Sequence, residues 1–356
     1  MPDSPPHLVF DGHNDVLLRL HKKAKAGVET DFLDGDGEGH LDLPRMLKGG
    51  FGGGLFAVYV PSGESLSDMD KLMQGERYDL PLPALMEAGA AIPVALALTA
   101  ILFRIERASK GAFRICRTAA DIRRCLAEGS IAAVFHMEGA EAIDRNLDGL
   151  EVLYRAGLRS LGPVWSRPTI FGHGVPFRYP STPDTGPGLT DAGETLIAAC
   201  NDLGIAIDLS HLNEKGFSDV ARLSRAPLIA THSNAYAICP HARNLTDRQL
   251  HAIADTGGMV GLNFATCFLR PDGQGGTDTP LETMARHLDH LIAEVGLYHV
   301  GFGTDFDGAQ VPQDIADVTG LPVLQAFLGQ HGYDQAALRK LCHENWIAVV
   351  ERTWGA

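Results

Sequence analysis

Short apolar runs, rich in β-branched and aromatic residues, recur along the chain, and most of them end in Gly, Asn, Asp or His. Eight such runs occur, at residues 8–15, 54–62, 131–139, 158–166, 204–211, 227–234, 259–266 and 299–308. They lack strict apolar–polar alternation, as expected of strands that are covered on both faces of a parallel sheet. The pattern therefore predicts eight buried parallel strands.

Helical patterns separate these runs. Thr246 begins a capping-box signature, and Thr190 or Asp191 is predicted to begin another helix. Thr279 is predicted to cap a third helix whose first residue is Pro280. Strands that alternate with helices predict an α/β fold, either a closed (β/α)8 barrel or a doubly wound sheet.

The first connection favours the barrel. The first run ends in DGHND (11–15), without the Gly-rich phosphate turn that often follows the first strand of a doubly wound sheet. Two connections are long: 61–130 is expected to hold inserted helices and a small strand near 113–116, and 167–190 is a loop rich in Pro, Gly and Thr. No repeat or linker is evident, so residues 1–356 are predicted to form one (β/α)8 TIM barrel domain.

Composition limits the partners. The 356 residues are 45% hydrophobic and 21% charged, which allows a large buried core. A net charge of −14 is repelled by nucleic acid phosphates and by anionic lipid, so neither is expected as a partner. Six cysteines are scattered without a CxxC pair, which argues against a structural zinc knot and favours buried thiols in a reducing compartment.

The terminal segments show no targeting signal. The first residues, MPDSPPHLVFDGHND, have neither a basic nor an apolar signal-peptide region, and the last, ERTWGA, carry no lipid-anchor motif. No run approaches about 20 uncharged apolar residues. We therefore expect no spanning helix, no membrane anchor and a cytoplasmic location.

Polar residues cluster where the predicted strands end. In a barrel these ends open onto one face, which carries the active site. The strand ends supply His13, Asp15, Glu138, His211, His232, Asp305 and Asp307. Residues i and i+2 of a strand point to the same side, so His13 and Asp15 can share one metal ion. A turn Asp beside a surface His is the alternative explanation.

Glu138 follows the apolar run IAAVF, where a carboxylate is costly unless it is paired or bound to metal. A helix-capping or salt-bridging role is the alternative. His136 lies two residues deeper and suits a supporting role behind the ligands. His211 and His232 occupy equivalent positions on consecutive strands, although each alone could be a core or turn histidine.

Histidine and carboxylate side chains that converge on one face suit zinc. Five ligands are too many for one open tetrahedral ion, so the pattern predicts two ions that share a carboxylate. Asp305 can take a proton from water and pass it to a leaving amine. Asp307, followed by Gly308, is more typical of a turn.

Several of these segments match one family. The chain resembles membrane dipeptidases (renal dipeptidases), a branch of the metal-dependent amidohydrolase barrels, from residue 8 to about residue 350. The matching segments are DGHND (11–15), HMEGAEAI (136–143), DLSH (208–211), ATHSNAYAICPHARNLTD (230–247), GFGTDFDG (301–308) and HENWIAVV (343–350).

The resemblance implies a ligand set. His13 and Asp15 would bind one zinc ion, and His211 and His232 the other. Glu138 would bridge the two ions together with a water or hydroxide. These ligands discriminate poorly among divalent metals, so manganese or another ion remains an alternative.

The resemblance also implies substrate contacts. Arg243 matches the arginine that holds the free carboxylate of the substrate, for which a planar guanidinium is well suited. A surface ion pair is the alternative. Asp305 matches the proton-transferring acid. Tyr59 matches an aromatic residue near the substrate, and a half-buried tyrosine of the barrel rim is the alternative.

One position departs from the family. After the fourth strand the family carries a His thought to assist the substrate carbonyl, and this chain has Trp165 there. His173 and Arg167 lie in the same loop and are candidates to replace it. We expect Trp165 to reshape specificity rather than to abolish catalysis.

The resemblance thus predicts a zinc-dependent dipeptidase, including activity on dipeptides with a C-terminal D-residue, and a homodimer. Two alternatives stay open at this point. One is an amidohydrolase for another small carboxylate-bearing amide or lactone, and the other is a non-catalytic metal-binding barrel.

Overall fold

The computed structural model describes residues 6–62 and 71–355. Each of the eight predicted runs overlaps one observed strand, although β2 begins three residues before its run, at Phe51. In one parallel sheet the order is β1 (Val9–Asn14), β2 (Phe51–Tyr59), β5 (Ile131–Glu138), β6 (Leu158–Gly162) and β8 (Ala206–Ile207). A second parallel sheet contains β9 (Ile229–Ala230), β10 (Met259–Leu262) and β11 (Val300–Phe302). The predicted short strand is also present, as β4 (Phe113–Ile115) beside β5.

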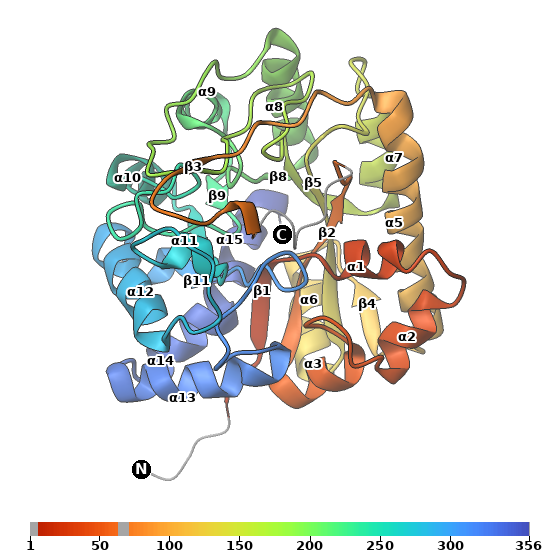
Figure 1. Cartoon of the computed structure of the whole chain (residues 1–356). Helices are drawn as coiled ribbons and strands as arrows, with labels where there is room; N and C mark the ends of the chain where they lie inside the picture. Colours follow the sequence, from red (N-terminus) through yellow and green to blue (C-terminus); the bar gives the residue numbers. More distant parts are fainter. Residues whose placement is uncertain (1–5, 63–70, 356) are drawn as a thin grey trace.

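Single bridges join the two sheets at both of their edges. Asp208 pairs in parallel with Ile229, next to β8 and β9, and Asn14 pairs in parallel with Phe306, between the ends of β1 and β11. Of the strands in these two sheets, β8 and β9 are the shortest, at two residues each. The chain is an α/β fold built on parallel strands, and in Figure 1 the helices surround them.

Close approach between strands closes the interior. A Cβ atom at Gly261 or Gly303 would collide with the carbonyl oxygen of Thr231, so only glycine allows this spacing. Trp346 is fully buried and donates from its indole nitrogen to the carbonyl of Phe302 at 2.9 Å. The space beside these strands is thus filled by side chains and closely spaced backbone.

Fourteen helices are labelled among the described residues. They are α1 (Val16–Lys22), α2 (Val28–Asp34), α3 (Leu43–Gly49), α5 (Ala88–Ala108), α6 (Ala119–Glu128), α7 (Asp148–Ala156), α8 (Asp191–Leu203), α9 (Glu214–Leu223), α10 (Asp247–Asp255), α11 (Thr266–Leu269), α12 (Leu281–Val295), α13 (Leu321–His331), α14 (Gln335–Arg339) and α15 (Asn345–Trp354).

Two of the predicted helix starts are confirmed and one is wrong. Thr190 caps α8, and Thr246 forms the capping box of α10. Helix α12 instead begins at Leu281, with Pro280 as its N-cap and no side-chain cap. Thr279 does not cap it, because its hydroxyl donates to the carbonyl of Gly276 at 2.6 Å.

The two long connections meet each other. Residues 61–130 hold α5, α6, β4 and the short β3 (Tyr78–Asp79), although 63–70 lie outside the described residues. The loop 167–190 contains β7 (Arg178–Tyr179), which pairs antiparallel with β3. Met73 from the first connection and Phe177 from the second both reach the cavity described below. The insertions therefore form part of its wall.

We expected no helix long and apolar enough to span a membrane, and this expectation is wrong, because one helix passes both criteria. Helix α5 has 21 residues and a mean hydropathy of 2.0 over its most apolar stretch. That stretch is 39% buried, and the inward side chains, such as Leu98 and Leu102, pack in the main core, where α5 contacts α1, α2 and β2. A single helix of this kind is weak evidence for a membrane, since core helices of soluble proteins pass the same test.

Candidate metal centre and active site

The first two candidate ligands come from the end of β1. His13 is fully buried in this strand, and Asp15 is the N-cap residue of α1. Asp15 makes no capping hydrogen bond to its own helix, although Asp is among the preferred capping residues. Its carboxylate turns instead toward His13, with Oδ2 at 3.3 Å from Nε2 of the imidazole.

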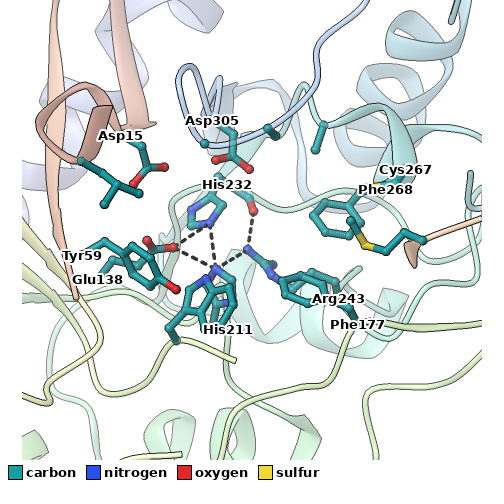
Figure 2. Close-up of a pocket in the computed structure, with 16 residues that line it drawn as sticks. Asp15, Tyr59, Glu138, Phe177, His211, His232, Arg243, Cys267, Phe268 and Asp305 are labelled. Atoms are coloured by element: carbon teal, nitrogen blue, oxygen red, sulfur yellow. Dashed lines mark hydrogen bonds and ion pairs between the residues drawn. The ribbon is translucent and has the colours of Figure 1, made fainter. Parts of the chain in front are cut away.

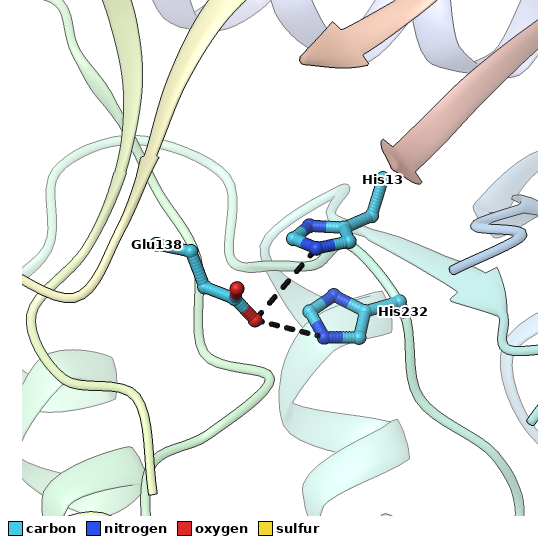
Figure 3. A group of neighbouring side chains, drawn as sticks. All are labelled: His13, Glu138 and His232. Atoms are coloured by element: carbon cyan, nitrogen blue, oxygen red, sulfur yellow. Dashed lines mark ion pairs between the residues drawn. The ribbon is translucent and has the colours of Figure 1, made fainter. Parts of the chain in front are cut away.

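Three histidines meet at one oxygen of Glu138, the residue that ends β5. Its Oε1 lies 2.9 Å from Nε2 of His211, 3.5 Å from Nε2 of His232 and 3.7 Å from Nε2 of His13. The Nε2 atoms of His211 and His232 are 3.1 Å apart, and the rings of His13 and His232 stack at 3.9 Å. Figures 2 and 3 show these side chains converging on Glu138 from separate strands.

A supporting network sets the protonation of His232. The hydroxyl of Thr231 donates to Oδ2 of Asp208 at 2.7 Å, so its oxygen is left to accept from Nδ1 of His232, also at 2.7 Å. With the proton on Nδ1, the Nε2 lone pair of His232 faces the centre. Support of this kind behind a metal-binding histidine fixes its tautomer and its orientation.

His211 presents the same nitrogen. Its Nδ1 lies 3.2 Å from the hydroxyl of Ser166, and its Nε2 lies 3.1 Å from Nη2 of Arg243. A guanidinium can only donate, so Nε2 of His211 acts as an acceptor there. Both histidines thus direct lone pairs, rather than protons, into the same small space.

The charges at the centre are strongly perturbed. Burial, which the neighbouring His13 only partly opposes, raises the pKa of Glu138 well above its usual value. Burial also lowers the pKa of His211 and His232, and Arg243 adds to this at both. Burial would lower the pKa of His13 too, but Glu138 and Asp15 outweigh it and raise this pKa to about 10. Carboxylates buried beside neutral imidazoles favour the binding of a cation.

The donor set fits divalent metal. Ligand atoms of His13, Glu138 and His232 lie within 4.8 Å of one another, and so do those of His13, Asp15 and Asp305. Among the described residues, both ring nitrogens of His13 and Oδ1 of Asp15 are buried without a hydrogen-bond partner. Buried polar atoms are rarely left unpaired, so the unpaired Nε2 of His13, close to the Asp15 carboxylate, is expected if both residues bind a metal ion.

Asp305 stands beside these ligands after β11, with a positive φ of 59°. Its Oδ2 accepts a hydrogen bond from Nδ2 of Asn263 at 2.9 Å, and Asn263 itself is almost fully buried. Burial raises the pKa of Asp305, while His13 opposes that rise. Asn263 was missed by the sequence analysis, although it closes the run MVGLN, at the position equivalent to the other strand-end polar residues.

Arg243 lies on the other side of the two histidines. Its Nη1 donates to the hydroxyl of Ser233 at 3.2 Å and its Nη2 to the carbonyl of His232 at 3.2 Å, while Nε has no partner among the described residues. The guanidinium packs over the ring of Phe268 at 5.7 Å. Burial lowers its pKa to about 10, so it stays charged at neutral pH. A buried cation with an unused donor is suited to an anionic ligand.

An aromatic wall completes the cavity. Tyr59 ends β2, and its ring lies 5.2 Å from that of Trp165, which in turn lies 5.4 Å from Phe177 and 5.7 Å from His211. The cavity contains about 550 Å³ of space, including its opening. This size suits a small molecule. Phe177, Phe268 and Met73 were not predicted, because loop and insertion residues give no periodic signal.

Other candidates have different surroundings. His173 is not among the described residues that line the cavity, and its Nδ1 faces the carbonyl of Gly188 at 3.2 Å. Arg167 is buried and engaged by Glu141, with Nη2 at 2.8 Å from Oε1, and by backbone. Asp307 accepts from the backbone N–H of His40 at 2.6 Å, consistent with a turn role. The geometry therefore brings none of the three to the substrate space.

Comparisons with known proteins match this chain to one family of peptidases. A family model described as membrane dipeptidase (peptidase family M19) matches residues 5–354. An uncharacterized protein in the pqqA 5′ region of Klebsiella pneumoniae is 50% identical over 255 residues, covering 72% of this chain and 94% of that protein.

Two solved structures are similar over their whole length. A metallopeptidase from Rhodobacter sphaeroides, liganded with a phosphinate mimic of the dipeptide L-Ala-D-Ala, is 59% identical with a TM-score of 0.97, covering 98% of this chain and 100% of that one. A dipeptidase of family M19, dipeptidase AC, is 60% identical with a TM-score of 0.96, covering 99% and 100%. An amidohydrolase from Pseudomonas aeruginosa, at 22% identity and a TM-score of 0.75 over 98% and 97%, shares the fold.

Proposed function

The chain belongs to the membrane dipeptidase family, and from this premise we propose that its buried centre hydrolyses the peptide bond of free dipeptides. It is a metallo-dipeptidase, a hydrolase acting on peptide bonds. The observation that carries the substrate proposal is the position of Arg243. This buried cation touches His211 at one end of a small cavity, so a carboxylate and a scissile bond can be held side by side.

We propose zinc as the metal, with two ions per chain. His13 and Asp15 would hold one ion, His211 and His232 the other, and Glu138 would contact both. The unpaired Nε2 of His13, and the Nε2 lone pairs that His211 and His232 direct toward each other, support this division. When bound, such ions would supply Lewis acidity toward the substrate carbonyl and make water a nucleophile at neutral pH.

The protein's own residues would position the dipeptide. Arg243 would bind the C-terminal carboxylate through its planar fork, which fixes the scissile bond at a constant distance from the histidines. Because Arg243 lies inside the cavity, a longer C-terminal extension would have no space. The Rhodobacter sphaeroides relative binds a mimic of L-Ala-D-Ala, so we extend the proposal to dipeptides with a C-terminal D-residue.

Asp305 would take a proton from water and pass it to the leaving amine. The amide of Asn263 occupies its Oδ2 at 2.9 Å, which leaves Oδ1 to face the substrate space. A carboxylate whose pKa is raised by burial is a better base than a solvated one, and it can then deliver the proton to the leaving amine.

We also propose that the two sheets close into a single (β/α)8 barrel. The bridges Asp208–Ile229 and Asn14–Phe306 support closure at both seams, because each continues the parallel direction of its neighbours. In such a barrel the functional residues belong at the carboxyl ends of the strands. His13, Glu138 and Asp305 occupy those positions.

The test combines metal analysis with a matched substrate set. Purified protein is assayed for metal by mass spectrometry and for turnover of L-Ala-L-Ala, L-Ala-D-Ala, L-Ala-D-Ala amide and N-acetyl-D-Ala. We expect about two zinc ions per chain and strong preference for the two substrates with both a free amine and a free carboxylate. Bound metal without dipeptide turnover would indicate that the substrate is another small amide. Active protein without metal would contradict the metal assignment.

A further inference from the structure

Outside the buried centre, we propose that helices α10 and α12 bind an additional divalent transition-metal ion at the surface of the protein. One ligand atom from each of Asp247, His290 and Glu294 lies within 4.8 Å of the other two. Asp247 is the first residue of α10, and His290 and Glu294 lie in the second half of α12. The two helices contact each other and are neighbours in Figure 1.

The helical spacing places these groups on facing surfaces. Asp247 and His251 are four residues apart on α10, and His290 and Glu294 are four residues apart on α12. Side chains at this spacing lie above one another on the same face of a helix. Each helix therefore offers one imidazole and one carboxylate to the other.

The contacts between the helices are crossed. Nε2 of His290 lies 2.8 Å from Oδ1 of Asp247, and Nε2 of His251 lies 2.8 Å from Oε2 of Glu294. Because the first pair and Glu294 already converge, one ion can take Asp247, His290 and Glu294 as ligands. His251 then supports Glu294 from behind, which is how supporting histidine–carboxylate contacts orient metal ligands.

The ligand chemistry selects the kind of ion. One imidazole nitrogen and two carboxylate oxygens form a mixed N/O set, which suits Zn²⁺ and its first-row neighbours better than Mg²⁺ or Ca²⁺. The side chains are partly exposed, from 23% for His290 to 57% for His251. Water can therefore complete the coordination, and the ion can exchange with solvent without opening the fold.

The position of this ion implies an effect on the stability of the protein. Asp247 directly follows Thr246, the N-cap of α10, and the segment leading into this cap carries Arg243. An ion held by Asp247 and α12 would fasten the end of that segment to the body of the protein. We therefore expect it to raise thermal stability and to leave the chemistry of the buried centre unchanged.

Zinc binding to tag-free protein tests the proposal. Wild type, His290→Gln and Glu294→Gln are stripped with a chelator and dialysed against buffered Zn²⁺, and bound metal is counted by mass spectrometry. We expect each variant to bind one ion fewer than wild type, with dipeptide turnover unchanged. His251→Ala keeps all three ligands and should weaken the same ion by about 10- to 100-fold. Added Zn²⁺ should stabilise the ligand variants less than wild type, because they keep only the contribution of the buried centre.

A neighbouring pair supplies the matched control. His331 of α13 lies 2.9 Å from Asp289 of α12, a similarly exposed imidazole–carboxylate contact that belongs to no three-ligand group among the described residues. Asp289→Asn should therefore bind as much zinc as wild type. Equal zinc content in wild type and His290→Gln, or an equal loss in Asp289→Asn, would overturn the proposal. Neither result depends on whether dipeptides are the substrate.

Discussion

Arg243→Lys tests whether Arg243 recognises the carboxylate of the substrate. The replacement keeps a cation in the same buried position but removes the planar fork that can hold both oxygens of a carboxylate. Arg243 is 3% exposed, and its Nε has no partner among the described residues, so this donor is free for substrate. The side chain is otherwise held by Ser233 and the carbonyl of His232, each at 3.2 Å.

The magnitude follows from the hydrogen bonds at stake. A bond to a charged group contributes about 1.5–3 kcal/mol. Losing one of two bonds should cost about 1.5 kcal/mol, or about tenfold in kcat/KM. Arg243→Ala removes both and should cost about 3 kcal/mol, or about 150-fold.

The assay compares L-Ala-D-Ala with its C-terminal amide, which lacks the carboxylate. Both variants should lose most of their kcat/KM on the dipeptide and little on the amide, so the preference between the two substrates should collapse. Metal content is measured alongside, because Nη2 of Arg243 also touches Nε2 of His211 at 3.1 Å. Equal losses on both substrates, with metal retained, would refute carboxylate recognition by Arg243.

Three further predictions concern the same cavity. Asp305→Asn should lower kcat by at least about 100-fold while metal content stays unchanged, and a variant with full kcat would contradict the role of Asp305 in proton transfer. In wild type, kcat/KM should fall as the pH drops through the pKa of Asp305, which burial raises above that of an ordinary Asp. Trp165→Ala should relax preference toward larger side chains, because Trp165, Tyr59 and Phe177 also line a neighbouring apolar pocket; an unchanged rate and unchanged preference across dipeptides of increasing size would show that Trp165 has no such role. Chelation should abolish turnover and lower the melting temperature, since an ion at a thousandfold excess over its Kd stabilises by about 4 kcal/mol; a melting curve insensitive to chelator would argue against a buried metal centre.

The sequence predicts the parts of the site that depend on strand ends. Such residues follow an apolar run, as His13 and Glu138 do, and parallel strands bring their carboxyl ends together. Prediction was weaker where tertiary contacts decide. Thr279 has the composition of a helix cap, yet its hydroxyl is taken by Gly276, and the helix begins two residues later. Local pattern carries no information about that competing bond.

The loop residues show the same limit. His173 and Arg167 were candidates because they lie in the right segment, but position within an irregular loop does not determine direction. Arg167 turns toward Glu141, and His173 toward a backbone carbonyl, whereas Phe177 from the same loop reaches the cavity. Apolar residues such as Phe177 carry no chemical signal in a sequence, so the wall of a cavity is harder to predict than its ligands.

Asp208 contributes both to the contact between the two sheets and to the protonation of His232. At 3% exposure it accepts from the backbone N–H and hydroxyl of Thr231 and also from Ser210, across the seam where β8 and β9 have only two paired residues each. Through Thr231 the same carboxylate sets the proton on His232. A substitution at Asp208 would therefore loosen the seam and disorient a metal ligand at once. Any change of residue 208 must therefore preserve two things at once, the contact between β8 and β9 and the orientation of His232.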